Sequence, residues 1–323
     1  MKLEKLLSAF QSTVYFPEIL KIKESFEAGK IDFLFLKGLP LYLYFEKSPP
    51  RRILADCDVL IDKNSEAKSR KIFNRLGYRL AETAYSKFHH RLKDKLTEVT
   101  YFKVVNNCLV VFDVHFEAVF LMNQLGKLDA LYPQRLVDEM TQQFLKEKQE
   151  VKIKGGKFPI LSPLNLIIYL SLHFFHHNFK GVHRLKFLNK IVCHYRKDMA
   201  NELGGEIIDK IKYYQLQNFV YPSFVMLNTA SRRVFPQRII DKIRPDRPAL
   251  EYIDKLICRQ NIIDREDRLT AGINRFKNIF YLSPHPWRRK VFIFLNPAVV
   301  YSIIWTLAGK LVFIFRRPRD RNH

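Results

Sequence analysis

The sequence predicts an α+β fold: a mixed β-sheet with flanking helices, followed by an all-helical C-terminal domain. Apolar residues recur with a helical period over residues 3–28, strand-like runs occupy residues 31–117, and beyond about residue 118 the pattern is helical. Hydrophobic residues make up 47% of the 323 residues, and 27 Phe against 11 Gly favour packed helices and strands over loops. The chain is therefore long and apolar enough for two domains, each with its own core.

The N-terminal lead, residues 1–30, is expected to be helical. Pro17 lies in the middle of its apolar pattern, and because proline removes a backbone hydrogen bond, two short helices are predicted there. Residues 31–37 (IDFLFLK) then form a buried strand. Residues 39–46 form a short helix, since proline is tolerated in a first turn and Pro40 lies there.

A second strand and a second helix follow. Residues 53–61 (ILADCDVLI) have the apolar character of a buried strand. The next helix has Asn64 or Ser65 as its N-cap and ends at Gly77, because these residue types satisfy the backbone groups at helix ends.

Two further strands are predicted as a hairpin. They cover residues 97–105 and 109–117, and the pair Asn106-Asn107 lies between them. Asparagine tolerates a positive φ, which the tightest hairpin turns require. The sheet is therefore expected to contain an antiparallel pair here.

The domain boundary is predicted at a short β-like stretch, Gly155–Pro159. The sheet domain then covers residues 31–155 and the helical domain residues 156–323. The first helix of the second domain has Ser162 as N-cap and Pro163 at its first position, a combination typical of helix starts.

The C-terminal segment, residues 288–317, is apolar with basic flanks. From Val291 to Phe315 the only charged residue is Lys310. A pair of buried terminal helices is the favoured interpretation. The alternative is a membrane anchor, either spanning or in peripheral contact with the surface, because the run has about the length of a membrane-spanning helix, roughly 20 residues.

The net charge of +23, from 55 basic and 32 acidic residues, favours an anionic partner such as nucleotide phosphates, RNA or an acidic membrane surface. It argues against a strongly cationic partner. The four cysteines are far apart, which predicts neither a zinc site nor a disulfide framework. With no signal-peptide pattern at the N-terminus, a cytoplasmic protein is expected, with membrane association as the alternative. The oligomeric state stays open.

Three aspartates lie in the predicted strands. Asp56 and Asp58 point to the same face of one strand, about 6.6 Å apart. Asp113 lies in a neighbouring strand and shares a face with His115. Three carboxylates at one place suit a hard cation, Mg²⁺ or alternatively Mn²⁺. In the structural alternative, Arg51 or Arg52 neutralises the two aspartates of the first strand.

Several short motifs around these aspartates resemble the uncharacterised bacterial nucleotidyltransferase family of the polymerase-β-like superfamily. The motifs are L-K-G at 36–38, R-x-x-x-D at 52–56, D-C-D-V-L-I at 56–61, L-G-Y at 76–78 and F-D-V-H at 112–115. Residues 161–177 and 184–192 are similar to two helices of that family, although members usually have aspartate where this chain has Asn189. The resemblance covers roughly residues 30–200.

The resemblance implies a nucleotidyltransferase-like sheet domain that transfers a nucleoside monophosphate from an NTP to an acceptor in a metal-dependent reaction. Asp56, Asp58 and Asp113 would be the catalytic residues and the metal ligands. The residues that would bind the NTP are Lys37, Gly38 and Arg52. The acceptor stays open among RNA, protein, sugar and small molecule.

The rival interpretation is a non-catalytic basic module on the same fold, which binds RNA or an anionic membrane surface. The histidines do not discriminate between the catalytic and the non-catalytic interpretation. His173 and His177 have zinc-like i, i+4 spacing, but a third ligand and the accompanying glutamate are absent from the motif, so packing roles are expected. His115 is expected to be a hydrogen-bonded lining residue, and the alternative is that it orients Asp113 or orders a water.

Overall fold

The computed structural model describes residues 2–81, 97–118, 121, 128–231, 234–258, 262–263, 266–297, 299–301 and 304. The elements of its first half are α1 (Lys2–Ala28), β1 (Phe33–Lys37), α2 (Leu39–Phe45), β2 (Cys57–Ile61), η1 (Lys63–Ser65), α3 (Glu66–Arg75), β3 (Arg79–Leu80), β4 (Glu98–Val105), β5 (Cys108–His115), α4 (Gln134–Lys146), β6 (Gln149–Ile153) and β7 (Gly156–Ile160). The elements of the second half are α5 (Pro163–His176), α6 (Val182–His194), α7 (Arg196–Ala200), α8 (Glu202–Tyr213), α9 (Gln217–Ala230), α10 (Gln237–Lys242), α11 (Arg247–Cys258), α12 (Arg268–Leu282), α13 (Trp287–Lys290) and η5 (Val291–Leu295).

The strands form one mixed sheet in the order β3-β4-β5-β2-β1-β7-β6, which confirms the predicted α+β fold. The pairs β2–β5 and β1–β7 are parallel, and the other neighbours are antiparallel. The hairpin β4–β5 turns at Asn106 and Asn107, whose φ angles of 49° and 58° confirm the predicted turn. The helix before this hairpin ends near Gly77, which has φ 82°.

Two sequence-based expectations are wrong. Helix α1 runs unbroken through Pro17, because Tyr15, Ile19 and Ile22 along it are fully buried and their packing outweighs one lost backbone hydrogen bond. The pattern after residue 118 is also not wholly helical. The hairpin β6–β7 lies there, and β7 pairs with β1, so the sheet extends past the boundary expected at residue 155.

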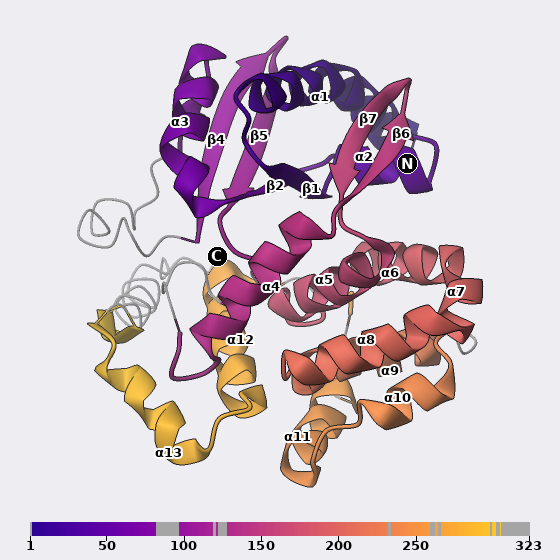
Figure 1. Cartoon of the computed structure of the whole chain (residues 1–323), viewed down its shortest axis with the longest axis vertical. Helices are drawn as coiled ribbons and strands as arrows, with labels where there is room; N and C mark the ends of the chain where they lie inside the picture. The colour runs from indigo at the N-terminus through magenta and orange to yellow at the C-terminus, as the bar shows by residue number, and fades with distance from the viewer. Residues whose placement is uncertain are drawn as a thin grey trace, which may run out of the picture.

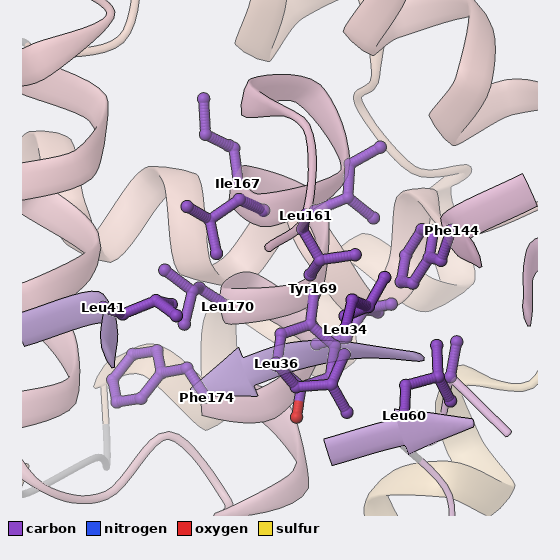
Figure 2. Packing of buried hydrophobic residues seen from close by; sticks show 14 of the residues in the cluster. Leu34, Leu36, Leu41, Leu60, Phe144, Leu161, Ile167, Tyr169, Leu170 and Phe174 are labelled. Carbon is purple, nitrogen blue, oxygen red and sulfur yellow. The ribbon is translucent and has the colours of Figure 1, made fainter. Parts of the chain in front are cut away.

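Each face of the sheet is covered by helices (Figure 1). Helices α1 and α3 cover the face with aromatic packing, in which the rings of Phe73 and Tyr101 stack at 4.2 Å. Helix α5 lies against the other face, where Figure 2 shows Leu36 of β1 beside Tyr169 and Leu170 of α5. The buried residues of the sheet and of the helical region form one contiguous cluster, so a site between the two parts has rigid walls on both sides.

The buried carboxylate of Glu18 ties α1 to the sheet. It accepts from Lys21 Nζ at 2.6 Å, from the Tyr78 hydroxyl at 2.9 Å and from Lys103 Nζ at 3.1 Å. Burial acts to raise the pKa of Glu18, but the bonds to Lys21, Tyr78 and Lys103 outweigh it and lower that pKa.

We therefore expect Glu18→Gln to reduce the free energy of unfolding by roughly 1.5–3 kcal/mol at neutral pH. A lowered folded-state pKa stabilises the fold above the ordinary pKa of Glu, and this contribution is lost as pH falls through the folded value. Urea titrations at pH 7 and pH 4 should therefore show a smaller difference at pH 4. The control is Glu27→Gln on the same helix, whose exposed ion pair with Lys23 should contribute at most about 1 kcal/mol. An equal loss in both variants would contradict this role for Glu18.

The prediction for the C-terminal segment lies mostly outside the described residues. Beyond residue 304 the apolar C-terminal segment is not described. In the described part of that segment Ile293 is buried, whereas Phe292 and Leu295 are 61% and 73% exposed. No helix within the described ranges is long and apolar enough to span a membrane. Membrane contact through residues 288–317 stays a prediction.

Candidate active site

The strand register brings the acidic side chains together on one face of the sheet. In the parallel pair β2–β5, Asp58 lies opposite Asp113 and Leu60 lies opposite His115. On the other side of β5, Thr100 and Glu98 of β4 lie opposite Asp113 and His115. Because side chains alternate along a strand, all of these polar groups share the face that α5 covers.

The three predicted aspartates converge. Asp56, Asp58 and Asp113 each offer a carboxylate oxygen, and these oxygens all lie within 4.8 Å of one another. Asp58 is only 2% exposed, whereas Asp56 and Asp113 are partly accessible. Carboxylate oxygens are the ligands that Mg²⁺ prefers, so the donor set fits a hard divalent cation.

Lys37 is the cation that neutralises two of these aspartates. Its Nζ lies 2.9 Å from Asp58 Oδ2 and 3.4 Å from Asp56 Oδ1. Burial acts to lower the pKa of Lys37, but the charges of Asp58 and Asp56 outweigh it and raise that pKa. In the structural alternative Arg51 or Arg52 would supply this charge, but the ion pairs of Asp56 and Asp58 within the described residues come from Lys37 and, for Asp58, also from His115.

A backbone irregularity gives Lys37 this position. The register shifts between Phe35 and Lys37, so that Lys37 pairs with Asp58. In an unbroken register Lys37 would point to the same face as Phe33 and Phe35, away from the aspartates. The bulge therefore turns the lysine onto the acidic face.

His115 joins Asp58 to a fourth carboxylate. Its Nε2 lies 2.9 Å from Asp58 Oδ1, and its Nδ1 lies 3.2 Å from Glu98 Oε2. Burial acts to lower the pKa of His115, but the bond to Asp58 and the charge of Glu98 outweigh it and raise the pKa to about 9. The imidazolium and Lys37 in turn keep the pKa of Asp58 low despite its burial. His115 thus positions Asp58 rather than merely lining the site.

Asp113 is the least neutralised of the three aspartates. Burial, followed by the charge of Asp58, raises the pKa of Asp113 to about 7, although the Thr100 hydroxyl donates to its Oδ1 at 2.6 Å. Burial and the charge of Asp58 also raise the pKa of Asp56. Lys37 and His115 leave this cluster with excess negative charge, which a bound divalent cation would relieve.

Gly38 lets β1 and β2 approach closely at the site. Its φ is 99°, and a Cβ there would lie 3.2 Å from the Cα of Cys57 and 3.4 Å from the Asp56 carbonyl oxygen. A glycine is therefore required between Lys37 and α2. Its backbone caps α2 without a side-chain cap bond.

Arg52 lies apart from the ion pairs of the aspartates. Its guanidinium is exposed, and its Nη1 lies 3.5 Å from the Ile53 carbonyl oxygen. Burial is the larger cause that lowers the pKa of His183 and of Arg184 at the start of α6, and the positive charge of Arg52 is the second cause. This places Arg52 toward the helical region.

Sequence reasoning missed Thr100 and Glu98. The positions of both residues could have been predicted, because the turn at Asn106-Asn107 determines which residues of the hairpin face each other. Counting outward from that turn pairs Thr100 with Asp113. The register shift beside Lys37 had no comparable signal in the sequence.

Comparison with known proteins identifies one family. The family model described as "Uncharacterised nucleotidyltransferase" matches residues 1–230 of the 323, which include every residue of the acidic site. No curated protein matches the chain significantly.

Proposed function

This chain belongs to the uncharacterised nucleotidyltransferase family, and on that premise we propose that it transfers a nucleoside monophosphate from an NTP to an acceptor hydroxyl or phosphate in a Mg²⁺-dependent reaction. The observation that carries the proposal is the convergence of Asp56, Asp58 and Asp113 within 4.8 Å. Bound to these carboxylates, Mg²⁺, or alternatively Mn²⁺, would offset charge on the reacting phosphates.

The reaction joins the acceptor oxygen to the α-phosphorus and breaks the bond from that phosphorus to the bridging oxygen, so that pyrophosphate leaves. Asp113 takes the acceptor proton on the oxygen that does not accept from Thr100. Thr100 fixes the orientation of this carboxylate, and His115 does the same for Asp58.

The NTP is held at the junction of β1 and α2. Lys37 pairs with Asp56 and Asp58, and it would be available to contact the triphosphate if cations neutralised these carboxylates in its place. Gly38 allows the phosphates to approach the backbone, and Arg52 contributes a further positive charge from the other side. The acceptor lies between the sheet and the helical region.

The test is a thermal shift titration of the full chain with each NTP, with and without Mg²⁺. A ligand at a hundred times its Kd should stabilise the fold by about 2.7 kcal/mol. We expect the shift to require Mg²⁺ and to disappear with EDTA. Stabilisation by NTP that is equal without the cation would contradict the proposal. The rival basic module predicts tight RNA or anionic-lipid binding with no requirement for Mg²⁺.

A further inference from the structure

A basic cavity of about 650 Å³ lies in the helical region, between the end of α5, the start of α6 and α12. Its charged and titratable lining consists of His177, Lys180, His183, Arg184, Lys186, Arg275 and one carboxylate, Glu266. The cavity therefore has four permanent cations and one anion among its described lining residues.

The single carboxylate, Glu266, forms no ion pair with Arg184 or Arg275, although its charge acts on Arg275. Glu266 accepts hydrogen bonds from Asn178 Nδ2 at 2.9 Å and from Asn274 Nδ2 at 2.8 Å. Within the described part of the chain, no carboxylate lies within ion-pair distance of Arg184 or Arg275, and the Nε atoms of both are buried without a hydrogen-bond partner. Buried donors of this kind are uncommon in folded proteins and indicate a missing acceptor.

The electrostatics agree with a site prepared for an anion. Burial is the main cause that lowers the pKa of Arg184 to about 10, and the charge of Arg52 is the second cause. Burial likewise lowers the pKa of Arg275 to about 10, and burial together with Arg52 lowers the pKa of His183 to about 4. Positive charge is therefore crowded and poorly solvated here, and an anion would stabilise it.

The cavity is electrostatically coupled to the acidic site. The charge of Asp56 acts on Arg184, and the charge of Glu98 acts on Arg275, so both arginines lie within electrostatic reach of the aspartate cluster. Helix α6 also packs on α2, where the rings of Tyr42 and Phe187 lie 4.6 Å apart. A molecule bound in the cavity would thus lie within electrostatic reach of the aspartate cluster.

We propose that this cavity binds a phosphate group carried by the acceptor, so that the acceptor is a phosphorylated small molecule. The inference rests on the proposed function. The triphosphate of the NTP is assigned to Lys37, Gly38 and Arg52, none of which lines the cavity, and the cavity supplies a second set of cations. Arginine forms forked hydrogen bonds that match a phosphate. A volume of about 650 Å³ accommodates a ligand of this size.

The test measures calorimetric binding of inorganic phosphate and of phenyl phosphate to the full chain, without Mg²⁺. Arg184→Gln and Arg275→Gln should each raise the Kd about tenfold to a hundredfold. Lys190→Gln, on α6 but outside the cavity, should leave the Kd unchanged. Arg184→Lys, which retains the charge and loses the fork, should give an intermediate Kd, and thermal melts confirm that each variant is folded.

A second arm identifies the source of the phosphate. Phenyl phosphate should still bind when Mg²⁺ and a non-hydrolysable NTP analogue saturate the protein. Displacement by the analogue would assign the cavity to the triphosphate and overturn the proposal, as would unchanged binding in both arginine variants. The two proposals can fail separately. If the proposed function is wrong, NTP will show no Mg²⁺-dependent binding, while phosphate still binds in the cavity.

Discussion

Asp58→Asn is expected to abolish Mg²⁺-dependent NTP binding and to lower the rate of transfer by about a thousandfold or more. Asp58 is the most buried of the three aspartates, and it contacts both Lys37 and His115. The amide keeps the shape of the side chain but removes the charge that a cation requires. The measurement is NTP affinity by calorimetry in Mg²⁺, together with pyrophosphate release in the presence of a pool of candidate acceptors.

Two further variants make this result specific. Asp113→Asn should leave NTP affinity nearly unchanged while transfer collapses, because Asp113 acts mainly on the acceptor and in the transition state. Asp241→Asn, at an exposed position of helix α10, should behave as the wild type. Full NTP binding by Asp58→Asn in Mg²⁺, or loss of NTP binding in Asp113→Asn alone, would contradict the assigned roles.

Lys37→Met is expected to have opposite effects on stability and on cation affinity. It removes the ammonium that lies 2.9 Å from the buried Asp58 carboxylate, and breaking such a pair destabilises a protein by roughly 3 kcal/mol. A divalent cation competes with that ammonium for the same carboxylates. Without Lys37, Mn²⁺ should therefore bind more tightly in the absence of nucleotide, whereas NTP affinity should fall by roughly 1.5–3 kcal/mol.

Calorimetric titration with Mn²⁺ and denaturation with and without the cation test both effects. Mn²⁺ should restore more stability to Lys37→Met than it adds to the wild type. Lys37→Arg serves as the control, since it retains a positive charge near Asp56 and Asp58. Unchanged Mn²⁺ affinity in Lys37→Met would show that the lysine and the cation do not share the carboxylates.

The sequence by itself determined the local elements and the direction of the key side chains. Alternation along a strand predicted Asp56 and Asp58 on one face; in the structure β2 begins at Cys57, and Asp56 lies directly before it. The pair Asn106-Asn107 determined how β4 and β5 face each other. These features depend on residues that are close in the chain, so the local pattern carries them.

Only the tertiary structure decided which separate segments meet. It kept α1 continuous through Pro17, added β7 beside β1, and turned Lys37 toward Asp58 through a shift in register. It also gathered Arg184 and Arg275 around one cavity, although they are far apart in the chain. These outcomes follow from the burial of apolar faces against distant partners, and that packing free energy depends on the whole fold rather than on neighbouring residues.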